Sequence, residues 1–302
     1  MTQKELHECL TRTFGFNNFG RNKDLSVEHL EDIYLAVSAA YRDMSVRTIS
    51  GFAAVEEYKK TAIRLWLTRK LYDYFEGPAK DKDGFDKYHK LLYEEFVATL
   101  KDFIKPDGEE RDNADTKKLD GIEEKITAGK AQKIINMAFK NLYCFSVPAK
   151  TDDDKLMDYY RYCHMALDSN ILGWFWTDVI TWYENTHERV PRSYRKSWSN
   201  LEYGGENAEG SYLWIQTIIR KYFEAGGDPK WSEYLPKDLE EENDKPIECN
   251  PFVPFTAEFF LWAKLIAKQD LPQTIFDGLK KCPADGKSIL KLVSPCSEKQ
   301  AQ

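Results

Sequence analysis

This sequence lacks the long apolar run that a membrane-spanning helix requires. No stretch of its 302 residues approaches the roughly 18 consecutive apolar residues of such a helix. The first residues, MTQKELHECLTRTFGF, also lack the apolar core of a secretory signal peptide. We therefore expect a protein of the cytoplasm that has no membrane partner.

Cysteines at metal-binding or redox spacing are missing as well. The six cysteines lie far apart, and no CxxC motif occurs. The nearest cysteine–histidine pair is Cys163 and His164, and adjacent residues rarely bind one metal ion. The P-loop, the dinucleotide-binding GxGxxG, the GxSxG elbow and HExxH are also absent from the sequence. The sequence thus predicts reduced thiols, no metal site and no cofactor.

Basic charge is in short supply, because the net charge is −7. A general nucleic-acid coat protein usually carries a basic surface that releases phosphate counterions, so this composition argues against that class. The segment HERVPRSYRKSW is a local exception. Its cations are Arg189, Arg192, Arg195 and Lys196. Such a segment can bind phosphates, although a solvated run of charges has the same pattern.

Helical periodicity is what the sequence has in abundance. Apolar residues recur at spacings of three, four and seven through most of residues 30–104. Alternating strand patterns between hairpin turns are absent from the sequence, so we expect an all-α fold with two packed helical lobes. The polar run at 105–120 marks a boundary. We place a helical N-terminal region at 1–118 and a helical core at 119–302.

Lys133 stands in a segment that is otherwise suited to a buried helix. In GKAQKIINMAFKNLYCF (129–145), Lys133 and Asn136 share one helical face, and apolar residues cover most of the remainder. The lysine stem can pack while its amine emerges into a cleft. Apolar surroundings disfavour a charged amine, which makes the neutral nucleophile accessible for imine chemistry. A purely structural lysine would show the same pattern.

Asp168 is the carboxylate best placed to act with this lysine. It lies in CHMALDSNILGWF (163–175), directly before an apolar run, where an aspartate suits the N-cap of a helix. A carboxylate near the amine could orient the reacting group, stabilise positive charge or relay protons. Helix capping alone would also account for its position.

Together these two segments resemble the helix-hairpin-helix DNA glycosylase superfamily, particularly its bacterial 8-oxoguanine DNA glycosylase-like branch. In that superfamily a catalytic lysine opens an apolar helix, and an essential aspartate starts the next helix. The resemblance, over roughly residues 120–265, implies that Lys133 attacks the sugar of a flipped nucleotide with Asp168 as its partner. It also implies a glycosylase-like helical core with a helical N-terminal extension. The implied activity is hydrolytic base excision in DNA repair.

The same resemblance suggests which residues would contact DNA. A glycosylase takes its target base out of the stack and holds it in an aromatic-lined pocket. We expect the basic segment to position phosphates. The residues expected to contact the base or to orient the catalytic pair are Asn136, His164, Trp174 and Gln216. Each of these could equally serve the core of the protein.

Two alternatives remain open at this point. The family's hairpin is a glycine-rich turn, whereas DGIEEKITAGKAQK contains only Gly121 and Gly129. Lys130 is the fallback nucleophile if the register differs. The missing hairpin, the acidic charge and the large inserts also fit a glycosylase fold without chemistry. Such a protein would be a nucleic-acid or protein interaction module, for instance in bacterial defence against phage.

Overall fold

The structure, a computed structural model, consists in its described part of helices joined by turns and irregular segments. It describes residues 27–45, 55–104, 126–144, 158–227, 254–258 and 261. Among these residues no strand occurs, which confirms the all-α prediction for this part of the chain. The boundary expected at 118/119 lies outside the described residues and stays a prediction.

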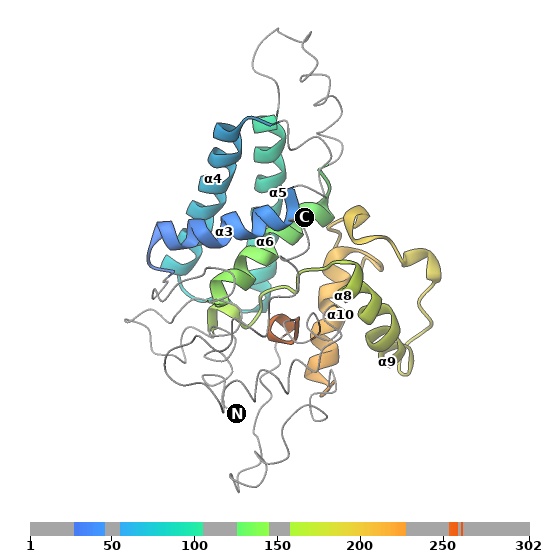
Figure 1. Cartoon of the computed structure of the whole chain (residues 1–302). Helices are drawn as coiled ribbons and strands as arrows, with labels where there is room; N and C mark the ends of the chain where they lie inside the picture. Colours follow the sequence, from blue (N-terminus) through green and yellow to red (C-terminus); the bar gives the residue numbers. More distant parts are fainter. Residues whose placement is uncertain are drawn as a thin grey trace, which may run out of the picture.

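Four helices form the first group, on one side of the molecule in Figure 1. They are α3 (Leu30–Ser45), α4 (Glu57–Glu76), α5 (Lys82–Ile104) and α6 (Ala128–Tyr143). Both α3 and α5 pack against α4 and α6. The apolar faces of the four helices meet in one hydrophobic cluster, in which Phe85, Phe96 and Phe139 are completely buried. Burial of such large side chains supplies the main driving force for this packing.

The second group contains α8, α9 and α10. One continuous helical run comprises α8 (Ser169–Trp174), the π-helical turn η5 (Phe175–Val179) and α9 (Ile180–Glu184), and it packs on α10 (Tyr212–Glu224). Their apolar side chains form a second hydrophobic cluster around Trp214 and Phe175. The chain between α9 and α10 includes two short 3-10 turns, η6 (Arg192–Tyr194) and η7 (Trp198–Asn200).

The turn η7 lies against the first turn of α6, where the two groups of helices meet. The Trp198 ring packs against both hydrophobic clusters, and the Thr127 hydroxyl donates a hydrogen bond to the Ser199 carbonyl. A Cβ atom built on Gly129 would lie 1.8 Å from the Trp198 carbonyl oxygen. Glycine at 129 is therefore what lets η7 approach the helix so closely.

Replacing Gly129 by alanine should destabilise the protein by more than about 1 kcal/mol, because the backbone of η7 would have to move. Helix propensity alone would give the opposite sign, a gain of about 0.5–1 kcal/mol. Gly173 provides the matched control. It is exposed in α8 with nothing within 4 Å of its Cβ position, so Gly173→Ala should show that gain. Urea denaturation measures both variants, and equal effects would contradict the close contact at Gly129.

Candidate active site

Residues 163–168 connect the two groups of helices in a conformation that is neither helix nor strand. The side-chain amide of Gln216, on α10, forms hydrogen bonds with both backbone polar groups of Met165. Its side chain accepts the Met165 N–H at 3.1 Å and donates to the Met165 carbonyl at 2.7 Å. The Ala166 N–H donates to the Glu258 carboxylate at 2.8 Å. Buried backbone groups need such partners, and here side chains supply what a neighbouring strand would supply in a sheet.

Helix α6 holds the end of the same connection. The Gln132 amide donates to the Leu167 carbonyl at 3.2 Å and to the Gly129 carbonyl at 2.8 Å. Gln132 directly precedes Lys133 in the sequence, and Leu167 directly precedes Asp168. This one side chain therefore fixes the backbone that carries the predicted nucleophile against the backbone that carries its predicted partner.

The structure brings Lys133 and Asp168 together. The Lys133 Nζ atom lies 3.6 Å from Asp168 Oδ2, and the two side chains are 20% and 16% exposed. The other carboxylate oxygen, Oδ1, accepts the N–H groups of Asn170 and Ile171 at 2.9 and 3.0 Å, as the N-cap of α8. The cap thus holds the carboxylate in place and leaves Oδ2 free to contact the Lys133 amine. The two side chains are in contact, and both remain partly exposed to solvent.

Trp198 is a member of this site that the sequence interpretation missed. The Lys133 ammonium lies 5.0 Å from the centre of the Trp198 ring, within the range of a cation–π interaction. The ring remains partly exposed. A signal for it did exist, because Trp198 ends the run RSYRKSW, in which basic and aromatic residues alternate.

The predicted phosphate-binding residues are all exposed, and their segment leads directly into Trp198. They are Arg189, Arg192, Arg195 and Lys196. The Arg195 guanidinium lies 5.4 Å from the centre of the Trp176 ring, and Lys196 Nζ lies 3.2 Å from the Glu202 carboxylate. The segment reaches the lysine–aspartate pair through Trp198, whose ring centre lies 5.0 Å from Lys133 Nζ. Phosphate binding itself stays a prediction.

The four residues expected to contact a base lie in the interior. Trp174 is 6% exposed and packs in the second cluster, with its ring edge-on to Tyr222. The amide of Gln216 is occupied by Met165, as described above. Asn136 and His164 are each 1% exposed and belong to a buried polar network. Contacts of these four residues with a base stay predictions, whereas the structure shows the contacts that they make within the protein. The fallback Lys130 lies on the first turn of α6.

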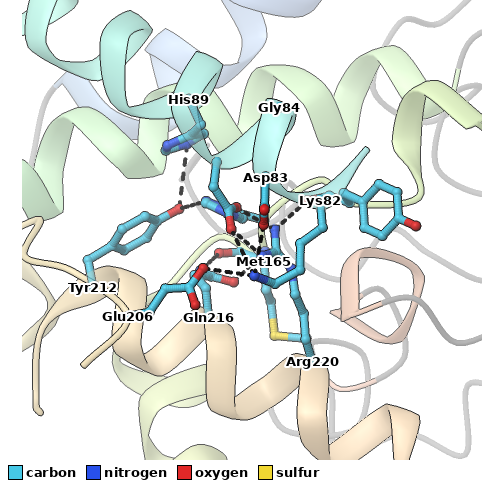
Figure 2. A network of polar contacts seen from close by, with 12 residues as sticks. Lys82, Asp83, Gly84, His89, Met165, Glu206, Tyr212, Gln216 and Arg220 are labelled. Carbon is cyan, nitrogen blue, oxygen red and sulfur yellow. Dashed lines mark hydrogen bonds and ion pairs between the residues drawn. The ribbon is translucent and has the colours of Figure 1, made fainter. Parts of the chain in front are cut away.

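Figure 2 shows this network between α5 and α10, in which Tyr212 and Arg220 extend toward His89 and Lys82. Asp86 accepts two hydrogen bonds from Arg220 at 2.7 Å each and one from His164 at 2.8 Å. These contacts tie α5 and α10 to the first residues of the 163–168 connection.

The same network continues into α6. The second ring nitrogen of His164 contacts the Tyr212 hydroxyl at 2.8 Å. The Asn136 amide donates to that hydroxyl at 2.8 Å and to the Met165 carbonyl at 3.2 Å. His89 completes the network through the Asn136 Oδ1 atom at 2.9 Å. One connected set of hydrogen bonds therefore links α5, α6, α10 and the connection.

The buried histidines are neutral near pH 7. Burial lowers the pKa of His164 to about 4, although the hydrogen bond to Asp86 opposes the shift. Burial also lowers the pKa of His89 well below its ordinary value. For Asp86 burial alone would raise the pKa, but the hydrogen bonds from His164 and Arg220 together lower it well below its usual range. The charged groups in contact within this cluster are therefore Asp86, Arg220 and Lys82, whose Nζ atom lies 3.7 Å from Asp86 Oδ2.

Replacing Asp168 by alanine should lower the free energy of unfolding by about 1 kcal/mol, because the N-cap of α8 is lost. Asp168→Asn should cost much less, since asparagine caps a helix about as well as aspartate. Urea denaturation measures both variants. If asparagine destabilises as much as alanine, the carboxylate charge rather than the cap holds the helix.

Stability should fall as the pH drops from about 6.5 to about 4. An unfolded histidine takes up a proton near pH 6.5, whereas His164 and His89 stay neutral in the folded protein, so the unfolded chain binds more protons. Below about pH 4 the loss continues, because unfolded aspartate is protonated while folded Asp86 stays ionised. Urea denaturation across this range measures the slope.

A histidine variant tests the cause of this slope. His89→Gln should make the slope between pH 6.5 and 4 shallower without abolishing it, because His164 still contributes. A wild-type stability that is constant from about pH 7 to about 4.5 would contradict the assignment of neutral buried histidines.

Comparison with known proteins identified no relative of this chain: no family model, no curated protein and no solved structure matches it. Within the described ranges, no helix is both long and apolar enough to cross a membrane. Among the same residues, no group of three or more histidine, cysteine, aspartate or glutamate side chains could hold a metal ion. The geometry of the lysine–aspartate pair therefore carries the functional argument.

Proposed function

We propose that this chain is a DNA glycosylase of the helix-hairpin-helix type that excises a damaged or modified base, with Lys133 as nucleophile and Asp168 as its partner. The observation that carries the proposal is the approach of Lys133 Nζ to Asp168 Oδ2, at 3.6 Å and partly exposed. Two residues distant in the sequence meet there in the relation that the resemblance implies, with the aspartate starting a helix. The exposed basic segment beside them supplies cations for a DNA backbone.

The chemistry begins with the proton on the lysine. The Lys133 ammonium gives a proton to the Asp168 carboxylate, and the neutral amine attacks C1′ of the nucleotide. The bond from C1′ to the base breaks and its electron pair leaves with the base, while the attacking nitrogen loses a proton and the base takes one up. Next the C1′–O4′ bond breaks with its electron pair on O4′, the nitrogen lone pair forms the second C1′–N bond, and O4′ takes up a proton, so that a protonated imine links Lys133 to C1′. The two N–H groups that hold Asp168 Oδ1 keep Oδ2 aimed at the amine through these steps.

A non-catalytic interaction module is the second candidate, and the same ion pair favours it. One carboxylate oxygen of Asp168 accepts the hydrogen bonds of the helix cap and the other lies near Lys133, so the pair is also a complete structural contact. Such a pair would hold α6 and α8 together and would need no substrate. The two candidates differ in one measurable respect, which is a covalent bond to DNA.

Borohydride should trap the wild-type protein on DNA that contains the right modified base, because it reduces the imine to a stable amine. A panel of modified bases in single-stranded and duplex DNA, resolved on a denaturing gel, measures the covalent complex. Lys133→Gln should abolish trapping. Asp168→Asn should slow it by roughly 10²–10⁴-fold, the usual contribution of an acid–base group.

Lys130→Gln is the matched control, since Lys130 lies on the same helix with the same charge. It should leave trapping unchanged. Loss of trapping in Lys130→Gln but not in Lys133→Gln would move the nucleophile to the fallback position. A wild-type protein that traps none of the panel would leave the interaction module as the better account.

A further inference from the structure

We propose that the segment 189–198 is a binding platform for single-stranded DNA, with Trp198 as the ring on which a base stacks. This inference rests on the proposed function for the identity of the nucleic acid, and it names the form of DNA that reaches the site. The observations that carry it are the exposure and charge of the segment, the position of Trp198 beside Lys133, and the covered start of α6.

The platform has the two ingredients of single-strand binding, namely cations for the backbone and a ring for the bases. Among the described residues, neither Arg189 nor Arg192 is in an ion pair, and both are exposed. Arg195 rests on Trp176, which holds its guanidinium against the surface while leaving the charge exposed. Trp198, partly exposed, follows three residues later. A base has a π-face whatever its sequence, so stacking of this kind tolerates any base.

Trp198 matters for the proposed chemistry because it lies next to Lys133. The ring lies 5.0 Å from the ammonium that would become the nucleophile. A base that stacks on the platform at this ring would bring its own sugar or the next one close to the amine. The cations would meanwhile hold the backbone on the preceding residues. Binding and chemistry would therefore use one continuous piece of surface.

Helices α6 and α10, which lie next to the lysine–aspartate pair and the polar network, offer little that would suit duplex DNA. Duplex readers commonly insert a helix into the major groove, but almost every residue of α6 and α10 is buried. A helix N-terminus can also bind a duplex phosphate through its free N–H groups. At the start of α6 that approach is obstructed, because Trp198 and Ser199 lie against Gly129 and Thr127. The cations and the ring instead lie in an irregular segment, which a flexible single strand can follow.

Equilibrium binding of labelled, unmodified oligonucleotides tests the proposal, since no base is then excised. Fluorescence anisotropy compares single-stranded DNA, duplex DNA and single-stranded RNA of one sequence. We expect single-stranded DNA to bind wild type at least about tenfold more tightly than the other two. Equal or tighter binding of the duplex would overturn the proposal. Tighter binding of the RNA would overturn the choice of DNA.

Variants of the exposed cations test the platform without endangering the fold. The double variant Arg192→Gln with Arg195→Gln should weaken single-strand binding, and the slope of log K against log salt should become shallower by about 0.7 for each cation removed. Arg69→Gln on α4 is the matched control. Arg69 is 63% exposed and also lies 5.4 Å from an aromatic ring, that of Tyr72. If Arg69→Gln has the same effect as the double variant, the binding is general electrostatics and the platform is wrong.

Trp198→Ala should weaken single-strand binding by roughly fivefold to hundredfold, and Trp198→Phe should retain most of it. Circular dichroism first shows that each variant is folded, and the arginine variants decide the matter if Trp198→Ala is not. The two proposals fail separately. Borohydride trapping with equal affinity for both forms of DNA overturns the platform alone. A strong single-strand preference with no trapping overturns the glycosylase alone.

Discussion

The described structure depends on how the chain crosses from its first group of helices to its second. Residues 163–168 cross without secondary structure, and side chains from other elements satisfy their backbone. Gln216 binds both polar groups of Met165, Glu258 accepts from Ala166, and Gln132 donates to Leu167. Leaving even one of these buried groups unpaired would cost about 1–3 kcal/mol. These hydrogen bonds therefore stabilise the conformation in which the connection crosses.

A buried ion pair, that of Asp86 and Arg220, lies at the start of this connection and requires good hydrogen-bond geometry. Asp86 and Arg220 pair in the interior, and a buried ion pair is favourable only when its geometry and its further hydrogen bonds are good. Here His164 also contacts Asp86, Lys82 Nζ lies 3.7 Å from Asp86 Oδ2, and Arg220 also donates to the Tyr162 carbonyl at 2.8 Å. The pair therefore anchors both flanks of the start of the connection. Removing either partner would leave an uncompensated buried charge, which is strongly destabilising.

The sequence pattern predicted the helices and made Lys133 and Asp168 candidates, whereas their pairing came from the resemblance. Helical periodicity identified the segments, and Lys133 and Asp168 stood out because each interrupts or precedes an apolar run. The partners that join them left no periodic signal. Nothing in the local sequence marks Gln132 of α6 or Arg220 of α10, because bonds between distant elements depend on packing that no local pattern records. Trp198 could have been identified, since it ends an alternation of basic and aromatic residues.

The position of Trp198 changes how the lysine–aspartate pair can work. Lys133 Nζ lies 3.6 Å from the Asp168 carboxylate and 5.0 Å from the centre of the Trp198 ring, so one amine contacts both the residue proposed as its partner and the ring proposed to stack a base. Under the two proposals, a base stacked at Trp198 would exclude water from the lysine–aspartate pair, and electrostatic interactions are stronger where water is excluded. The ring that recognises the strand would therefore also set the surroundings in which the amine reacts.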